Sequence, residues 1–249
     1  MVASPGTEAP GSDARRYAPE MTTPPVLLVH GFASSYLRNW VEPGWVDLLS
    51  EAGREVIGVD LLGHGDAPKP HDPAAYEHLE DSVVAAVGDR WPVDAIGFSL
   101  GAQLLLRLAA AAPERFSHLV VGGVGRNVFE ASDPEPAARA VLTGEAADGD
   151  HEAAQAFSRF ARAPGNDPEA LAACLRRPHE RLRPEDLSGV HLPVLVVLGD
   201  RDFAGPAAPL LDALPQGRLV TLAGGDHFGA PKDFRFLDAA LEFLGAQPG

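Results

Sequence analysis

Val93-Asp94-Ala95-Ile96 leads into Gly97-Phe98-Ser99-Leu100-Gly101-Ala102, and this stretch decides the fold of the chain. The apolar residues before Gly97 predict a strand, and the helical pattern from Gln103 to Ala112 predicts a helix. A serine on a sharp strand-to-helix turn, with a glycine two places away on either side, is typical of a nucleophile elbow. Because such a turn strains the serine backbone, its flanking residues must be small. The hydroxyl of Ser99 is then expected at the carboxyl end of its strand, where open α/β sheets bind ligands.

The rest of the chain alternates between strand-like and helical patterns on both sides of this turn. The further predicted strands cover residues 26–30, 55–60, 119–124, 193–198 and 218–222, and the further predicted helices cover 45–52, 76–90, 206–214 and 232–244. Continuous apolar runs such as 26–30 are typical of strands that are buried on both faces. The alternation therefore predicts an α/β fold with a mostly parallel, doubly wound sheet.

Two segments depart from this alternation. Residues 1–23 are rich in Pro, Gly, Ser, Thr and Ala and lack an apolar core, which predicts a flexible tail and no secretory signal peptide. Residues 126–190 contain no strand-like run, and short helical stripes predict an insertion of two to four helices. The predicted organisation is thus a core of residues 24–125 and 191–249, with residues 126–190 as an inserted helical cap.

Composition excludes several classes of protein. A net charge of -15 over 249 residues disfavours nucleic acid and anionic membrane surfaces as partners. No stretch approaches the roughly 20 apolar residues of a membrane span. A single cysteine, Cys174, excludes an internal disulfide framework and is compatible with a cytoplasmic location, which we expect. The nine histidines form no metal-binding motif, so we expect no metal and no cofactor. The expected partner is a small-molecule substrate, and the oligomeric state is left open.

A serine, an aspartate and a histidine, residue types that can take part in catalysis, each follow a different predicted strand. Ser99 is followed along the chain by the loop Gly199-Asp200-Arg201-Asp202 and then by Asp226-His227-Phe228. A serine nucleophile needs a base, and the base needs a carboxylate to orient it. Because parallel strands place their exit loops on one edge of the sheet, the serine, an aspartate and the histidine are expected to meet there. The order Ser…Asp…His is the one expected of an α/β-hydrolase.

The chain resembles the α/β-hydrolase fold family from about Pro24 to Gly245. The motifs that carry the resemblance, in chain order, are His30-Gly31-Phe32, Asp60-Leu61-Leu62-Gly63-His64-Gly65, the elbow at Gly97 to Gly101, the acid loop at Gly199 to Asp202, and Asp226-His227-Phe228. Many family members carry an antiparallel strand hairpin before the His-Gly strand. Only about two dozen mostly loop-like residues precede that strand here, which predicts that one or both of those strands are absent.

The resemblance implies a role for each matching residue. Ser99 would be the nucleophile, His227 the general base and acid, and Asp202 the carboxylate, with Asp200 as the alternative acid. The backbone N–H groups of Phe32 and Leu100 would form the oxyanion hole. The family's other acid position, after Val124, holds Gly125-Arg126-Asn127 and no carboxylate. His30, Asp60 and His64 are expected to brace loops, and Asp226 is expected to stabilise its own loop.

A serine at the elbow predicts an acyl-enzyme, which disfavours the aspartate-dependent dehalogenases and epoxide hydrolases of this fold. The leading hypothesis is a carboxylic-ester hydrolase. A thioesterase, a lactonase, a carbon–carbon bond hydrolase, a hydroxynitrile lyase and a non-catalytic small-molecule binding protein are the alternatives. Candidate residues of the substrate pocket are Tyr36 and Trp40 beside the oxyanion segment, and Phe129, Phe157 and Phe160 in the predicted cap.

Overall fold

The computed structural model describes residues 23–145 and 152–247, with the side chains of residues 152–154 left out. The predicted tail, residues 1–23, lies almost entirely outside the described residues. The described chain forms one six-stranded sheet in the order β2-β1-β3-β4-β5-β6, and every neighbouring pair is parallel. The strands are β1 (Val26–Val29), β2 (Val56–Val59), β3 (Val93–Phe98), β4 (Phe116–Gly122), β5 (Val194–Gly199) and β6 (Gly217–Leu222). The predicted parallel α/β architecture is confirmed.

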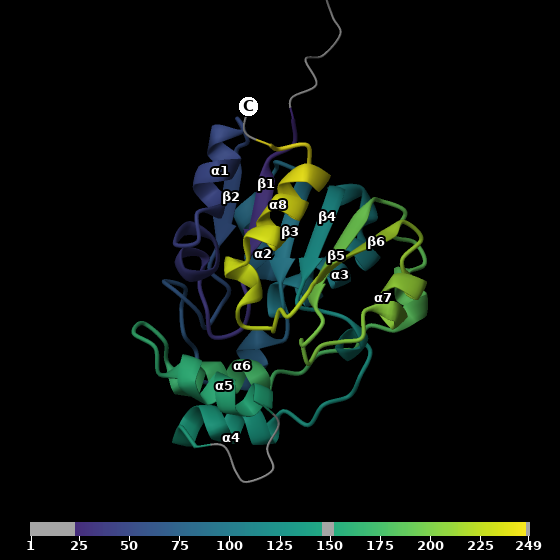
Figure 1. Ribbon diagram of the computed structural model, residues 1–249. Coiled ribbons are helices and arrows are strands. Elements are labelled where there is room, and N and C mark those ends of the chain that lie inside the picture. Colours follow the sequence, from purple (N-terminus) through teal and green to yellow (C-terminus); the bar gives the residue numbers. More distant parts are fainter. Residues whose placement is uncertain (1–22, 146–151, 248–249) are drawn as a thin grey trace, which may run out of the picture.

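Helices cover both faces of this sheet (Figure 1). The α-helices are α1 (Trp45–Glu51), α2 (Asp81–Val87), α3 (Leu100–Ala111), α4 (Glu135–Thr143), α5 (Glu152–Ala161), α6 (Pro168–Leu175), α7 (Ala208–Ala213) and α8 (Phe234–Phe243). A π-helical turn covers Leu37–Val41, and 3₁₀ turns cover Pro73–Tyr76, Pro113–Arg115, Arg126–Val128, Pro184–Leu187 and Ala230–Lys232.

Alternate residues of each strand supply two separate hydrophobic layers, as the two-residue period of a strand requires. In β1, Leu27 and Val29 pack with the side chains of α2, α3 and α7. Val26 and Leu28 of the same strand pack on the other face with α1 and α8. All four side chains are fully buried, which explains why the sequence shows a continuous apolar run there.

The helix predicted over residues 76–90 is shorter than expected. Residues 73–76 form a 3₁₀ turn, and α2 begins only at Asp81. The Tyr76 hydroxyl donates to the carbonyl of Pro70 at 2.7 Å, and its ring lies directly over Gly63. These contacts fix the first turn to the preceding loop, and Gly88, with φ +60°, ends the helix early.

Helices α4, α5 and α6 lie within residues 126–190, the segment that we call the cap segment. They lie together beyond the carboxyl ends of the strands, below the sheet in Figure 1. The same edge of the sheet carries the exit loops of β1, β3, β5 and β6. The cap segment is therefore placed opposite the loops in which the sequence predicts the site.

A buried ion pair lies at the other edge of the sheet, where the strands begin. The guanidinium of Arg54 contacts the carboxylate of Asp94, and both side chains are only 3% exposed. Arg54 also donates to the carbonyls of Pro24 at 2.6 Å and Leu244 at 3.2 Å, and His118 Nδ1 lies 2.8 Å from Asp94. The pair therefore holds the entry to β1 and the end of α8 against β3.

No helix of the described residues has the length and apolarity that a membrane crossing requires.

Helix α3 approaches the sheet so closely that only glycine fits at two positions. A Cβ atom on Gly101 would lie 2.3 Å from the carbonyl oxygen of Val29 in β1. A Cβ atom on Gly97 would lie 2.7 Å from the Leu105 side chain and 2.8 Å from the Ala102 backbone. Both clashes involve α3, so the two glycines set how deeply this helix packs on the strands.

We therefore expect Gly101→Ala to lower the free energy of unfolding by about 2 kcal/mol or more, because backbone cannot move aside as a flexible side chain can. The control is Gly189→Ala, since Gly189 is exposed and a Cβ there meets no atom within 4 Å. Urea unfolding of both variants measures the difference. Equal stabilities would show that α3 relaxes without cost.

Candidate active site

Ser99 lies at the junction of β3 and α3, in the strained conformation that the elbow pattern predicts. Its φ is +50° and its ψ is −110°, a region that costs a residue with a side chain about 1–3 kcal/mol. The Ser99 N–H donates to the carbonyl of Gly122 in β4 at 2.8 Å, which fixes the turn. The partly exposed Ser99 side chain thus stands at the carboxyl end of the central strands.

The structure brings Ser99, His227 and Asp202 together in a hydrogen-bonded chain. His227 Nε2 lies 3.0 Å from Ser99 Oγ, and His227 Nδ1 lies 2.9 and 3.0 Å from the two carboxylate oxygens of Asp202. His227 is 3% exposed and the Asp202 side chain is fully buried. The Asp202 carboxylate accepts a hydrogen bond from Nδ1–H, which leaves the Nε2 lone pair free to accept from the serine hydroxyl.

The two neighbouring aspartates are engaged elsewhere. Asp200 accepts a hydrogen bond from the Gly224 N–H at 2.8 Å, and Asp226 accepts one from the Gly229 N–H at 2.8 Å. Both are exposed. The loop-stabilising role expected of Asp226 is confirmed, and the geometry favours Asp202 over Asp200 as the partner of His227. Asp202 also accepts from the Ala204 N–H at 2.9 Å, which holds its carboxylate in place.

Of the two residues whose N–H groups are predicted to form an oxyanion hole, Leu100 directly follows Ser99, and Phe32 follows Gly31 in the loop after β1, which we call the oxyanion loop. Leu100 is the first residue of α3, so its N–H has no acceptor within the helix. Phe32 lies in the loop that leaves β1, and a Cβ on its neighbour Gly31 would lie 3.4 Å from Ser99 Cβ. The Gly31 N–H donates to the buried side chain of Asn39 at 2.9 Å, which fixes the loop beside the elbow.

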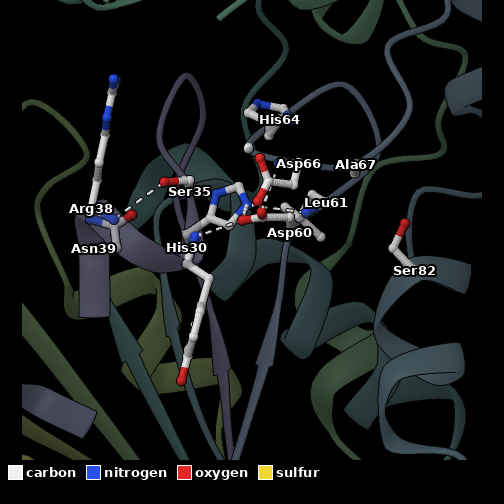
Figure 2. Close-up of polar contacts among 12 residues, drawn as sticks. His30, Ser35, Arg38, Asn39, Asp60, Leu61, His64, Asp66, Ala67 and Ser82 are labelled. Atoms are coloured by element: carbon white, nitrogen blue, oxygen red, sulfur yellow. Dashed lines mark hydrogen bonds and ion pairs between the residues drawn. The ribbon is translucent and has the colours of Figure 1, made fainter. Parts of the chain in front are cut away.

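A polar network supports this loop from below (Figure 2). The Asp60 carboxylate accepts from the Tyr36 N–H at 2.7 Å and the Asp66 N–H at 2.8 Å. His30 Nδ1 donates to the Gly31 carbonyl at 2.8 Å, and its Nε2 accepts from the Leu61 N–H at 3.1 Å. Burial lowers the pKa of His30, in keeping with a neutral ring that donates from one nitrogen and accepts at the other. The bracing roles predicted for His30 and Asp60 are confirmed.

His64 belongs to the same region and is fully buried. Burial, with a smaller effect of the neighbouring His30, lowers the pKa of His64 to about 3, so the ring is neutral. Its Nδ1 donates to the carbonyl of Leu62 at 3.0 Å, which braces the loop after β2, as predicted. The ring stands edge-on to Phe32, with 5.6 Å between the ring centroids.

The five predicted pocket residues separate into two groups. Trp40 is fully buried against Trp45 on the sheet face that α1 and α8 cover, and Tyr36 lies over Gly58 of β2. Phe129 packs against the core beside α3 and α7. Phe157 and Phe160 of α5, by contrast, reach the loops that carry the catalytic candidates. The contacts of the described residues thus link only the two α5 residues to the site.

Sequence reasoning missed two aromatic residues at this site, Phe203 and Phe228. The ring of Phe203 lies 4.3 Å from the His227 ring, and the ring of Phe228 lies 5.3 Å from it, measured between centroids. The signal available in the sequence was their position, because each directly follows a residue of the predicted triad. Phe228 also lies 5.2 Å from Phe160 and 6.1 Å from Phe157.

A cavity of about 300 Å³ lies behind the acid loop, between β5, β6 and the start of α7. Its lining residues include Asp202, Gly205 and Thr221, but neither Ser99 nor His227. This cavity therefore reaches the carboxylate of the hydrogen-bonded chain but not the serine or the histidine.

Side-chain contacts fasten the cap segment to the core. Asn166 donates to the carbonyl of Ala33 at 2.9 Å, next to the oxyanion loop, and the guanidinium of Arg38 contacts the carbonyl of Pro164. His71 of the core lies between two carboxylates at the start of α6, with Nε2 2.9 Å from Asp167 and Nδ1 2.8 Å from Glu169. Both imidazole nitrogens must carry protons to satisfy both carboxylates, so this contact requires the charged form of His71.

Several proteins of known family or activity are similar in sequence to this chain. Residues 24–144 match the family defined as alpha/beta hydrolase fold. A pimeloyl-[acyl-carrier protein] methyl ester esterase of Nitrosomonas europaea is 29% identical over 232 residues, which cover 82% of this chain and 88% of that enzyme. An acetyltransferase component of the acetoin cleaving system of Pseudomonas putida is 33% identical over 99 residues, but the chain spans only 25% of its length.

Solved structures agree on the fold. A bromoperoxidase from Bacillus anthracis has a TM-score of 0.71 at 23% identity, covering 90% of this chain and 92% of that one. A 2-hydroxy-6-oxo-6-phenylhexa-2,4-dienoate hydrolase from a Rhodococcus species has a TM-score of 0.65 at 20% identity, covering 90% of each chain. The fold is thus that of the α/β-hydrolases. On the match of residues 24–144 and the similarity to the esterase, we identify the chain as an enzyme with the α/β-hydrolase fold.

The contact of His71 with the two carboxylates predicts how the stability of the protein changes with pH. Hydrogen bonding to Asp167 is the main cause that raises the pKa of His71 above its ordinary value of 6.5. The stabilisation of the folded state by this contact is then complete below about pH 6.5. It is lost as the pH rises through the raised pKa of His71. We expect Glu169→Gln to move the His71 pKa back toward 6.5, as measured by NMR titration of the imidazole. Wild type should exceed His71→Gln in stability more at about pH 6 than at about pH 9, and the reverse order would exclude the contact.

Proposed function

We propose that the protein is a serine hydrolase that cleaves a carboxylic ester through an acyl-enzyme on Ser99. The observation that carries this proposal is the hydrogen-bonded chain from Ser99 through His227 to the buried carboxylate of Asp202. A strained, partly exposed serine within hydrogen-bond distance of a histidine nitrogen has the geometry of an activated nucleophile. The substrate is a small molecule, and the proposed reaction needs neither a metal nor a cofactor.

In the first half of the reaction, Ser99 Oγ attacks the ester carbonyl carbon while His227 Nε2 takes the hydroxyl proton. The carbonyl oxygen becomes an oxyanion that accepts hydrogen bonds from the N–H groups of Phe32 and Leu100. One such donor typically contributes about 3 kcal/mol to transition-state stabilisation. The carbon–oxygen bond to the alcohol then breaks, and His227 gives its proton to the departing oxygen.

In the second half, a water molecule attacks the acyl-enzyme as His227 takes one of its protons. The bond to Ser99 Oγ breaks, the proton returns to the serine, and the carboxylic acid leaves. Asp202 stays ionised throughout and stabilises the imidazolium that forms twice in the cycle. Its burial and its hydrogen bond from the Ala204 N–H keep it in that position.

The similarity to a methyl ester esterase over most of both chains supports ester cleavage. The structural likeness to a dienoate hydrolase keeps a carbon–carbon bond hydrolase as the second candidate, since the same serine and base serve both reactions. Thioesters and lactones are further substrates open to the same acyl-enzyme, whereas a non-catalytic binding protein would have no use for the aligned triad.

Short p-nitrophenyl esters test the nucleophile. We expect Ser99→Ala to reduce kcat for p-nitrophenyl acetate by about 10³-fold or more, because no acyl-enzyme can form. A fluorophosphonate probe should label the wild type at Ser99, as read by mass spectrometry. If wild type and Ser99→Ala hydrolyse the ester equally slowly and the probe leaves Ser99 unmodified, the proposal fails and a binding protein is favoured. If the probe labels Ser99 but esters are not turned over, thioester, lactone and carbon–carbon substrates identify the reaction.

The acid loop supplies a matched pair of variants. Asp202→Asn should reduce kcat by about 10³- to 10⁴-fold, because the amide stabilises the wrong imidazole tautomer. Asp200→Asn, two residues away on an exposed side chain, should stay within a few-fold of wild type. Steady-state kinetics with the same ester compare the two. A larger loss in Asp200→Asn would reassign the carboxylate.

A further inference from the structure

Two aromatic rings in the loops after β5 and β6 contact the imidazole of His227, and Phe98 of β3 lies 5.1 Å from it. Phe203 is tilted to the imidazole, with an interplanar angle of 35° and 4.3 Å between centroids. Phe228 stands nearly perpendicular to the imidazole at 5.3 Å. Phe203 and Phe228 are themselves 5.9 Å apart, so the two loops that deliver the acid and the base also deliver adjoining rings.

Helix α5 of the cap segment continues this aromatic surface. Phe160 lies 5.2 Å from Phe228 with an interplanar angle of 36°. Phe157, one helical turn earlier on the same face, contacts Phe32 edge-on at 5.1 Å. We call Phe160, Phe203 and Phe228 the base-side rings, because Phe203 and Phe228 contact the imidazole of His227 and Phe160 packs on Phe228.

The base-side rings keep substantial apolar surface exposed. Phe160 is 41% exposed and Phe203 is 39% exposed, while His227 between the loops is 3% exposed. Exposed aromatic rings that gather beside buried reacting groups mark a surface for an apolar ligand. The exposed carboxylates of Asp200 and Asp226 lie in the same two loops, which favours a neutral ligand over an anionic one.

The chemistry of the triad decides which part of the substrate this surface meets. His227 Nε2 must give its proton to the departing oxygen, so that oxygen lies within hydrogen-bond reach of the imidazole. The substituent on the departing oxygen therefore extends along the rings that flank His227. The acyl chain starts instead from the carbonyl carbon, whose oxygen points toward the N–H groups of Phe32 and Leu100.

We propose that the base-side rings form a leaving-group subsite, and that the preferred substrate is a neutral ester of an aromatic or bulky apolar alcohol. This inference rests on the proposed esterase function and adds the identity of the alcohol to it. Phe157 and Phe160, considered from sequence as parts of a general substrate pocket, divide between the oxyanion side and the leaving-group side.

Two isomeric esters give a direct test. Benzyl acetate carries the ring on the alcohol and methyl phenylacetate carries it on the acyl group, while their leaving alcohols have similar acidity. We expect wild type to show a kcat/KM about tenfold higher for benzyl acetate. Phe160→Ala, which removes a ring that is not in contact with His227, should reduce this preference several-fold, and Phe203→Ala should reduce it further. Phe234→Ala, on an exposed ring of α8, is the matched control and should keep the wild-type ratio.

Product inhibition provides a second readout. Benzyl alcohol should inhibit wild type more strongly than phenylacetate does, and Phe160→Ala should weaken inhibition by benzyl alcohol alone. If Ser99-dependent hydrolysis is found but methyl phenylacetate is equal or preferred, the subsite is overturned while the esterase function stands. If neither ester is hydrolysed and Ser99 resists the fluorophosphonate probe, the esterase function itself fails.

Discussion

The close approach of α3 to β1 is the constraint on which the site depends. At Gly101 the helix lies so near the strand that a single methyl group would overlap the carbonyl of Val29. The chain must turn from β3 into this helix within one residue, and Ser99 therefore takes a positive φ that it would otherwise avoid. The strain is held by packing on both sides of the residue. The position of the hydroxyl is thus a property of the core and not of a flexible loop.

The oxyanion loop depends on a second, polar constraint. Asp60 and His30 lie at the ends of neighbouring strands, and their side chains bind the backbone of both exit loops. Because burial keeps His30 neutral, it donates at one nitrogen and accepts at the other. Part of this support comes from the fully buried imidazole of His30, where a hydrogen bond is worth more than in water. The elbow and the oxyanion loop are held independently, one by shape and one by hydrogen bonds.

The sequence predicted what depends on local patterns repeated at strand ends. Apolar runs located the six strands, and the polar residues after them identified Ser99, Asp202 and His227, which the structure brings together. It did not predict contacts that depend on distances between loops. Trp40 follows the oxyanion segment in the sequence and was therefore predicted to line the pocket. Its indole is instead buried against Trp45, on the sheet face that α1 and α8 cover. Phe203 and Phe228 meet at His227 because parallel strands β5 and β6 end side by side, so the sequence signal was only that each follows a residue of the predicted triad. The helix expected over 76–90 was shortened by a tertiary bond of Tyr76.

The edge contact between Phe157 and Phe32 has a consequence for affinity. In this structure, α5 of the cap segment packs Phe157 against Phe32, and Asn166 adds a hydrogen bond to the neighbouring Ala33. A substrate that enters between them must replace these internal contacts, so the protein's own side chains act as a competing ligand. Apparent affinity is then the intrinsic affinity reduced by the fraction of molecules in which the rings have separated.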